Sequence, residues 1–292
     1  YTGYYTFSDE KYNFKFGHKR LSILDLTSAG NQPFKTESGS ILIYNGEIYN
    51  HYSVRRVIEK KLKIQWKSTS DTETLIHLLE NFTIDFALEN LEGMFSFLYY
   101  NKKKQKLIVS RDLAGEKPMY LHFNKNIISF SSNLLTISKL NNIEKKIDDV
   151  SVSSYKKYSY IPYPNTIYKN FFKLPPASYM EINLNDFNLK DFSNFGDLIV
   201  SKGITFREWW KPTKNLDNNL LIKNFSFEKQ KFILEKTLTS SIDKQLISDA
   251  PLGAFLSGGI DSSLIVSIAS KLKKKLNTFT IGFDFNTHDE SI

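Results

Sequence analysis

The sequence predicts two domains of different classes: a mixed, largely antiparallel α+β domain, followed by the beginning of a parallel α/β domain. Short runs of alternating apolar and polar residues, separated by turn residues, recur through residues 1–183 and leave room for few helices. Residues 226–283 read instead as helix, strand, helix and strand. The 292 residues are enough for about two such domains.

The first domain is expected to contain several short strands with two helices between them. The strands are predicted at 41–44, 94–100, 106–110, 119–123 and 127–131, with turn signals such as Asn45-Gly46 between them. The helices are predicted over about 51–61 and 71–90. Ser70 is expected to cap the second helix, and Glu73 stands three residues later, as in a capping box.

A proline-rich stretch and a weakly periodic stretch follow. Four prolines within 160–176 predict an extended segment rather than a helix. Residues 184–225 are polar and aromatic, and we interpret them as a linker or strap that Trp209 and Trp210 anchor by burial. The expected boundaries are therefore a first domain at 1–183, a linker at 184–225 and a second domain at 226–292.

The second domain is predicted to begin with an amphipathic helix within 226–250. A strand at 252–256, a helix at 263–274 and a strand at 277–283 follow, which is a strand–helix–strand crossover. Parallel sheets are buried on both faces and need further strands and covering helices. We therefore expect the second domain to continue beyond Ile292.

Composition excludes several classes of protein. The formal charge is +8, but the lysines are dispersed, so a nucleic-acid partner is not expected. No apolar run approaches the length of a membrane span, and no membrane partner is expected. Cysteine is absent, which excludes disulfides and cysteine-based metal sites within these residues. The chain starts with Tyr rather than Met, so we expect the natural N-terminus to lie before Tyr1.

The segment from Ser257 to Ser263 is the most informative part of the second domain. A strand, a glycine loop and a helix N-terminus together form a cradle for an anion, because backbone N–H groups and the helix dipole face it. The hydroxyls of Ser257, Ser262 and Ser263 add donors, and Asp261 is a candidate Mg²⁺ ligand. No Gly-Lys-Ser/Thr follows, so this is not a Walker A loop. The alternative is a serine-rich turn in an ordinary α/β domain.

Residues of the first domain suggest a site for a free amino acid. The amide of Asn45 and the N–H of Gly46 can form an oxyanion hole. Arg20 can clamp an α-carboxylate, and Asp71, with the region of Glu47, can receive an α-ammonium group. Each has a simpler reading: a hairpin turn for Asn-Gly, a surface ion pair for Arg20 and a helix cap for Asp71.

As an ordered set, these motifs resemble one family, the glutamine-hydrolysing asparagine synthetases. The matching segments are Gly17-His18-Lys19-Arg20-Leu21-Ser22-Ile23, Tyr44-Asn45-Gly46-Glu47-Ile48-Tyr49-Asn50, Ser70-Asp71-Thr72-Glu73, Glu92-Gly93-Met94-Phe95, Arg111-Asp112-Leu113-Ala114-Gly115-Glu116-Lys117-Pro118, Lys173-Leu174-Pro175-Pro176-Ala177 and Ser248 through Ser263. The resemblance covers nearly the whole chain and is weakest in 184–225.

The resemblance implies a fold and a set of site residues. The fold would be part of an N-terminal-nucleophile αββα sandwich, the class II glutaminase domain, followed by the start of a Rossmann-like adenine-nucleotide domain. Glutamine would be bound by Arg20, Asn45, Gly46, Glu47 and Asp71, with Asn45 and Gly46 as the oxyanion donors. ATP would be bound by Leu256 through its backbone, by Ser257, Gly258, Gly259, Asp261, Ser262 and Ser263, and by Ile281 beside the adenine, with Mg²⁺ on Asp261.

The implied activity is the ATP-dependent amidation of aspartate to asparagine with ammonia from glutamine, giving AMP, pyrophosphate and glutamate. The enzyme would be cytoplasmic, and a homodimer is one expected state. The chain departs from the family in lacking its N-terminal nucleophilic cysteine and its early Arg-Gly-Pro-Asp segment. Truncation at both ends explains these absences, and we expect the 292-residue chain alone to be inactive. Asn133 also stands where the family usually has a glutamate.

Other functions remain open at this point. A related amidotransferase could act on another carboxylate, such as a sugar uronic acid in surface-polysaccharide synthesis, and some relatives close β-lactam rings. A glutaminase-dead, non-catalytic protein would bind only a nucleotide or a partner. A tRNA-modifying pyrophosphatase would share the serine–glycine loop but would not need the glutaminase-like first domain.

Overall fold

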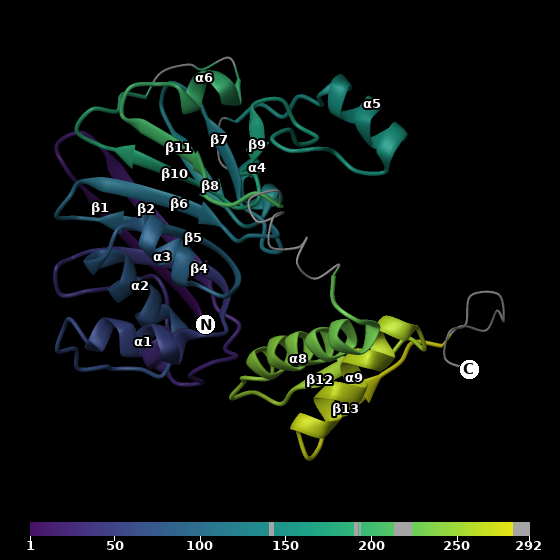
Figure 1. The fold of residues 1–292 in the computed structure, drawn as a ribbon. Coiled ribbons are helices and arrows are strands. Elements are labelled where there is room, and N and C mark those ends of the chain that lie inside the picture. Colours follow the sequence, from purple (N-terminus) through teal and green to yellow (C-terminus); the bar gives the residue numbers. More distant parts are fainter. Residues whose placement is uncertain (140–142, 190–191, 193, 213–223, 283–292) are drawn as a thin grey trace. The chain divides into compact units, whose positions relative to one another are not determined.

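The computed structural model describes residues 1–139, 143–189, 192, 194–212 and 224–282. It divides into two compact units, shown in Figure 1. The first unit contains Tyr1–Leu21 and Thr27–Lys211, and the second contains Ser22–Leu26 and the described residues from 212 onward. Each unit is described below by itself.

A six-stranded antiparallel sheet forms the centre of the first unit. Its strand order is β11 (Ile204–Glu208), β10 (Ser178–Asn183), β6 (Lys106–Arg111), β5 (Gly93–Asn101), β4 (Ile41–Ile48) and β3 (Phe34–Lys35). The side chains of β5 from Phe95 to Asn101 are buried, because both faces of the sheet are covered. The alternating runs that predicted strands here are confirmed.

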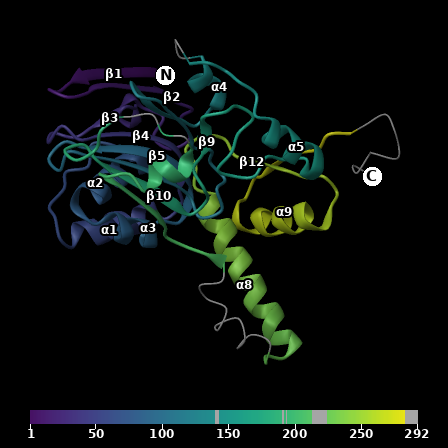
Figure 2. The ribbon, with the colours of Figure 1, turned by 90° about the horizontal axis from the view of Figure 1, so that it is seen from above.

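Helices cover one face of this sheet. They are α1 (His51–Glu59), α2 (Asp71–Asn81) and α3 (Ile84–Asn90), and Figure 2 shows them on the side opposite to β1 and β2. Val54 and Ile58 of α1 and Leu75 of α2 pack with Leu42 and Phe97 of the sheet in one buried cluster. The spacing of Val54 and Ile58 places them on one side of the helix, which accounts for the buried stripe.

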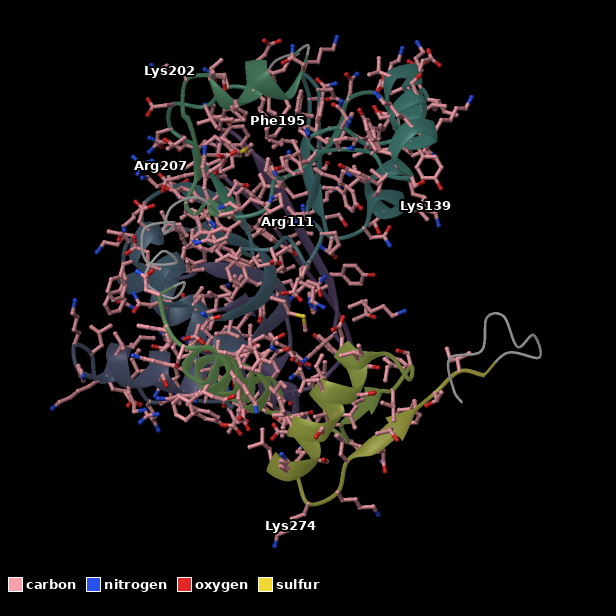
Figure 3. The ribbon with its side chains drawn as sticks, turned by 45° about the vertical axis from the view of Figure 1, so that its right-hand side comes forward. Arg111, Lys139, Phe195, Lys202, Arg207 and Lys274 are labelled. Carbon is pink, nitrogen blue, oxygen red and sulfur yellow. The ribbon has the colours of Figure 1, made fainter. Side chains whose placement is uncertain are left out.

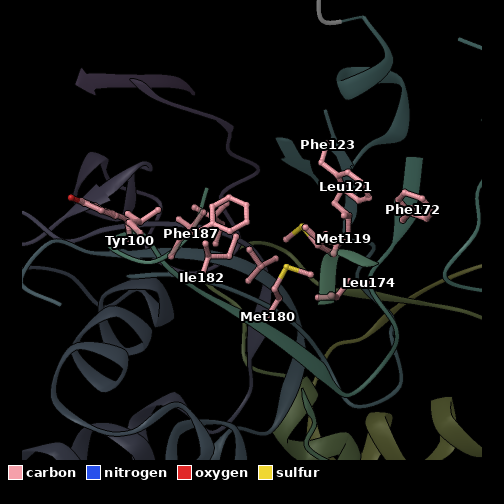
Figure 4. Close-up of a cluster of buried hydrophobic side chains, with 14 of the residues drawn as sticks. Tyr100, Met119, Leu121, Phe123, Phe172, Leu174, Met180, Ile182 and Phe187 are labelled. Carbon is pink, nitrogen blue, oxygen red and sulfur yellow. The ribbon is translucent and has the colours of Figure 1, made fainter. Parts of the chain in front are cut away.

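Two small sheets cover the other face. One is the hairpin of β1 (Thr2–Ser8) and β2 (Asn13–Lys19), and the other has the order β8 (Ile128–Ser131), β7 (Tyr120–Phe123) and β9 (Phe171–Lys173). Their apolar side chains meet those of the central sheet in the cluster shown in Figure 4, which includes Leu121, Phe172 and Met180. One helical layer and two β layers agree with the expected partial αββα sandwich.

Short helices complete the unit: η1 (Ser28–Gly30), α4 (Leu134–Ser138), α5 (Asp149–Tyr158) and α6 (Phe195–Ile199).

The helix expected over 71–90 is two helices. The first ends at Asn81, and Phe82 adopts an extended conformation. Thr83 then caps α3, because its side chain accepts the N–H of Phe86. The prediction of a single continuous helix was therefore wrong, because the hydroxyl of a threonine can accept a free N–H group where a new helix starts.

Half of the expected capping box is present. The hydroxyl of Ser70 accepts the N–H of Thr72 and caps α2, as predicted. Glu73 does not return to the N–H of Ser70, which bonds the hydroxyl of Ser68 instead. Its carboxylate accepts the N–H groups of Lys67 and Ser68 in the preceding loop. The prediction of a bond from the N–H of Ser70 to Glu73 was therefore wrong, because the N–H groups of this loop bind the carboxylate instead.

Asn45 and Gly46 do not form a turn, although the dipeptide is a strong turn signal. They lie inside β4, where Asn45 pairs with Ser96 and Gly46 with Phe95. A Cβ atom on Gly46 would stand 2.1 Å from the carbonyl oxygen of Met94 and 2.7 Å from the Cα of Phe95. This glycine is therefore required by the close approach of two strands and not by a hairpin.

The stretch expected to be a linker contains regular structure. Residues 195–199 form α6, and β11 pairs with β10 at the edge of the central sheet. The backbone N–H of Trp209 also donates to the carbonyl of Ala177. The described residues up to Lys211 therefore belong to the first unit, beyond the expected boundary at 183. Periodicity failed here because β11 is an edge strand with half-exposed and exposed side chains. Residues 213–223 of the expected linker lie outside the described part.

The second unit contains the predicted strand–helix–strand crossover. It follows α8 (Phe227–Gln245) and consists of β12 (Gly253–Phe255), α9 (Ile260–Leu272) and β13 (Asn277–Phe279), and β12 pairs with β13 in parallel. The helix begins at Ile260 and not at Ser263, so Asp261 and Ser262 lie in its first turn. The second strand ends at Phe279, and Phe283 lies outside the described residues. Among the helices that the structure describes, none has the length and apolar character needed to cross a membrane.

Gly46→Ala should destabilise the first unit by about 3 kcal/mol, because the added methyl group would have to displace strand backbone. Gly17→Ala is a matched control on β2, since a Cβ atom there would lie 3.4 Å from the ring of Tyr4, an ordinary contact distance. Urea denaturation of both variants measures the difference. Equal stability of the two variants would contradict the close approach of β4 and β5.

Candidate functional site

Asp71 and Tyr44 meet at the boundary between the helices and the central sheet. Asp71 is the first residue of α2, and its Oδ2 accepts the hydroxyl of Tyr44 at 2.8 Å and the N–H of Ile48 at 2.9 Å. The hydroxyl of Ser70 lies 3.4 Å from Oδ1. Burial raises the pKa of Asp71 above its ordinary value, although these hydrogen bonds act in the opposite direction. Burial and the nearby Asp71 raise the pKa of Tyr44 well above its usual range, so it remains a neutral donor.

Arg20 follows β2 and is held close to the start of α2. Its Nη1 donates to the carbonyl of Thr27 at 2.6 Å and to Oδ1 of Asn31 at 3.1 Å. Gly30 lies directly against the guanidinium: a Cβ atom there would stand 2.2 Å from Nη2 of Arg20 and 3.2 Å from the Cβ of Ser70. The structure therefore brings the cation of Arg20 close to the residue that precedes Asp71.

Glu47 adds a second carboxylate to this region. Its Oε1 is buried and finds no hydrogen-bond partner in the part of the chain that the structure describes. Burial is the largest cause that raises the pKa of Glu47, and the charge of Asp71 adds to it, while Lys117 lowers it. Two partly desolvated carboxylates that repel one another favour the binding of a cation between or beside them. An α-ammonium group is such a cation.

Asn45 and Gly46 present an amide and a backbone N–H close to these charges. Side chains alternate along β4, and Tyr44 and Ile48 pack with the helices, so Asn45 and Glu47 point to the opposite face of the sheet. On that side His18 of β2 bonds the carbonyl of Tyr44 through Nε2 at 3.0 Å. Burial lowers the pKa of His18, so the ring is neutral and Nε2 carries the donated hydrogen. This bond holds the hairpin to β4 one residue before Asn45.

A second loop lies at the same edge of the sheet. Strands β4 and β6 run in the same direction on either side of β5, so their C-terminal ends meet at one edge. The guanidinium of Arg111, a half-buried residue labelled in Figure 3, donates to the carbonyls of Gly115, Lys117 and Leu174 at 2.5, 2.7 and 2.8 Å. Asp112 accepts the N–H groups of Glu116 and Lys117. These bonds fix the loop whose Lys117 acts on the charge of Glu47.

The arrangement in the first unit suits an amino acid that carries a second functional group. It combines a cation from Arg20, carboxylates from Glu47 and Asp71, and amide donors on the adjacent strand. Sequence reasoning missed Tyr44, which holds Asp71, and Gly30, which makes room for Arg20. Tyr44 could have been found from its position, because its hydroxyl is placed on an otherwise apolar face with Leu42 and Ile48.

The serine–glycine loop of the second unit is compact. Gly258 has φ +84°, a left-handed conformation that favours glycine. The hydroxyl of Ser262 accepts the N–H of Ser257 at 3.3 Å and donates to the carbonyl of Gly259 at 3.1 Å. Leu256 donates its N–H to Phe279 and accepts the hydroxyl of Thr280 at 2.7 Å, which joins the loop to the segment that leads to Ile281.

The N-terminus of α9 is open to an anion. Its N-cap is Gly259, which has no side chain to cap the helix. Within 4 Å of a Cβ position on this glycine, and apart from its chain neighbours, the described residues place the hydroxyls of Ser257 and Ser262, at 3.5 and 4.0 Å. Asp261 lies in the first turn and is exposed. Within the described residues, no three His, Cys, Asp or Glu side chains gather as a preformed metal site. A single carboxylate still fits Mg²⁺, which is commonly held by one or two carboxylates together with substrate phosphates.

Two family models match the chain. The glutamine amidotransferase domain matches residues 3–193, and asparagine synthase matches residues 234–292. The first match covers the unit that holds Arg20, Glu47 and Asp71, and the second covers the serine–glycine loop. The order of the two models along the chain agrees with the order of the two units.

Curated relatives match over almost the whole chain. "Putative asparagine synthetase [glutamine-hydrolyzing] 2" of Methanocaldococcus jannaschii is 31% identical, over 99% of this chain and 55% of that protein. Asparagine synthetases [glutamine-hydrolyzing] 1 and 2 of Bacillus subtilis are 32% and 31% identical, over 92% and 94% of this chain and 39% and 35% of those proteins. The chain thus spans about half of the first relative and less of the others. With both family models and these relatives in agreement, the chain belongs to the glutamine amidotransferases of the asparagine synthetase type.

Proposed function

We propose that the chain supplies the glutamine site and part of the ATP site of an enzyme that amidates aspartate. The complete enzyme would hydrolyse glutamine to glutamate and ammonia. ATP would adenylate the β-carboxylate of aspartate with release of pyrophosphate, and ammonia would displace AMP to give asparagine. This proposal rests on the family of the chain and on the sites in its two units.

The observation that carries the proposal is the pair of carboxylates, Glu47 and Asp71, together with Arg20, whose guanidinium lies near Ser70 at the start of α2. The buried Oε1 of Glu47 has no hydrogen-bond partner among the described residues, and burial raises the pKa values of both carboxyl groups. A free amino acid satisfies all three groups at once: its ammonium group pairs with the carboxylates and its carboxylate pairs with Arg20. Its side-chain amide would then face Asn45 and Gly46.

In the glutaminase reaction these residues would bind, orient and stabilise charge. The oxygen of the glutamine amide becomes negative as a nucleophile attacks, and the amide of Asn45 and the N–H of Gly46 would stabilise it. The nucleophile would come from the complete enzyme, where the resemblance implies an N-terminal cysteine, since these 292 residues contain no cysteine. The bond from His18 to Tyr44 would hold the oxyanion donors in place.

In the synthetase reaction the second unit would hold the phosphates of ATP. The free N–H groups at the start of α9 and the hydroxyls of Ser257 and Ser263 would neutralise phosphate charge. Asp261 would hold Mg²⁺, which stabilises the charge of the departing pyrophosphate. Ile281 would lie by the adenine, and Leu256 would contact ATP through its backbone.

Asn45→Ala in the complete enzyme should lower glutamine-dependent asparagine synthesis by about two to three orders of magnitude, because one oxyanion donor is lost. Synthesis from ammonium ions should remain close to that of the wild type. Product formation from each nitrogen source, with aspartate or a sugar uronic acid as the acceptor, measures both points. Loss of the ammonium-dependent reaction would show that Asn45 has a structural role. If the enzyme amidated the uronic acid and not aspartate, the uronic acid would replace aspartate as the proposed acceptor.

Asp261→Ala should abolish pyrophosphate release and leave glutamine hydrolysis largely intact, because the two reactions use different units. Asp243→Ala is a matched control, since Asp243 is an exposed carboxylate of α8. Coupled assays of pyrophosphate and glutamate measure the two reactions separately. Equal loss of both in Asp261→Ala would contradict this division.

The KM for glutamine should rise as the pH falls, because the raised pKa values of Glu47 and Asp71 let protons compete with the ammonium group. The free energy of unfolding depends on pH in the opposite direction to glutamine binding. A carboxyl group whose pKa is raised by folding stabilises the protein below its unfolded pKa, and this contribution is lost as the pH rises through the folded value. Glu47→Gln should therefore keep or raise the Tm at neutral pH while it weakens glutamine binding.

Glu89→Gln, at an exposed position on α3, is the control for this variant. Thermal denaturation and glutamine kinetics between about pH 5 and 8 measure both effects. A lower Tm for Glu47→Gln than for Glu89→Gln would show that Glu47 has a stabilising partner within the protein.

A further inference from the structure

The position of Asp71 depends on the loop that leads into α2 and on the first turn of this helix. One oxygen, Oδ2, is engaged by Tyr44 and Ile48 from β4. A bound ammonium group must meet the carboxylate in the orientation that these bonds and the start of α2 impose. A small rotation of the first turn would move the carboxylate relative to β4, so the residues that hold this turn matter for binding.

Arg55 of α1 holds the first turn of α2 on both sides of Asp71. Its Nη2 donates to the carbonyl of Ser70 at 2.8 Å, and its Nε donates to the hydroxyl of Thr74 at 2.7 Å. Ser70 immediately precedes Asp71, and Thr74 lies three residues after it. Because the guanidinium is planar and rigid, two bonds to one turn fix the orientation of that turn and not only its distance.

The guanidinium of Arg55 is itself held in place. The side chain is 8% exposed, and its Cζ lies 4.2 Å from the centre of the Trp66 ring. The indole N–H of Trp66 donates to Glu59 of α1 at 2.7 Å. Burial lowers the pKa of Arg55, and Glu73 is the largest opposing influence. The cation therefore lies between α1, the loop residue Trp66 and the first turn of α2.

We propose that Arg55 is a positioning residue for glutamine binding, which fixes the first turn of α2 so that Asp71 is oriented to receive the ammonium group. This proposal rests on the proposed function. Arg55 has its donors directed to Ser70 and Thr74 and acts through Asp71 without touching the substrate. Lysine cannot replace it, because a single ammonium group has no planar pair of donors for the two acceptors.

Arg55→Lys and Arg56→Lys in the complete enzyme form a matched pair. The two arginines are adjacent on α1, and Arg56 is exposed while Arg55 is buried. Steady-state kinetics with glutamine give KM and kcat, synthesis from ammonium ions tests the second active site, and thermal denaturation tests the fold. A merely structural role of Arg55 would lower the Tm without changing the KM of the folded enzyme.

Arg55→Lys should raise the KM for glutamine about tenfold, as expected for the loss of a hydrogen bond from a charged group, with kcat changed less than about twofold. Ammonium-dependent synthesis should be unchanged, and Arg56→Lys should behave as the wild type. An unchanged KM in Arg55→Lys would overturn the positioning role, and so would an equal KM increase in Arg56→Lys. A wild-type enzyme that does not hydrolyse glutamine would instead overturn the proposed function and this role together.

A second variant keeps the test decisive if Arg55→Lys does not fold. Trp66→Phe keeps an aromatic ring against the guanidinium and removes the bond to Glu59, so it loosens Arg55 without removing it. We expect a smaller increase of the KM for glutamine, about twofold to threefold, again with kcat and the ammonium reaction unchanged. A KM equal to that of the wild type in a folded Trp66→Phe enzyme would overturn the proposal.

Discussion

The buried carboxylate of Asp71 joins the helical layer of the first unit to its central strand. It accepts one bond from the side chain of Tyr44 and one from the backbone of Ile48, so it fixes α2 to both ends of the Asn45–Glu47 segment. Its place in the first turn of α2 lets the helix dipole partly offset the cost of burying a charge. The same carboxylate thus sets the geometry of the fold and forms one wall of the candidate site. The other features of the site, from the glycine at position 46 to the loop after β6, are arranged around the strand that it holds.

The candidate site is electrostatically unfavourable in the absence of a ligand. Glu47 and Asp71 repel one another, and both are removed from part of their hydration. Proteins commonly keep such arrangements at binding sites, where the ligand supplies the missing charge. Arg20 does not neutralise the pair by itself, since its Nη1 is bonded to Thr27 and Asn31 and its Nη2 lies against Gly30. The site separates positive from negative charge, and this separation matches the two charged ends of a free amino acid.

Much of the layer architecture could be predicted from the sequence, while the contacts could not. Strands such as β5 and β6 are central and buried on both faces, so their short, nearly continuous apolar runs mark them as strands. The edge strand β11 has exposed side chains, and its pattern is too weak to separate it from a loop. Asn45-Gly46 was misread as a turn because the signal for a hairpin and the requirement for close strand approach use the same residue types. The proximity of Arg20 to the start of α2 could not be predicted from the sequence, because these residues are far apart in the chain and no local pattern links them. The resemblance to a family supplied the candidate site residues, but not Tyr44 and Gly30, which lie against Asp71 and Arg20.

Substitutions of Gly30 are expected to affect activity more than the amount of folded protein. A side chain there would collide first with the tip of Arg20, a flexible group, and not with strand backbone. The fold can yield at this point by moving the guanidinium, so substitutions at position 30 would leave the amount of folded protein in the cell nearly normal. If Arg20 binds the substrate carboxylate as proposed, activity would fall because the cation is displaced. In a survey of variants that scores abundance and activity separately, position 30 would therefore group with the proposed substrate-binding residues, although glycine has no side chain with which to bind a ligand.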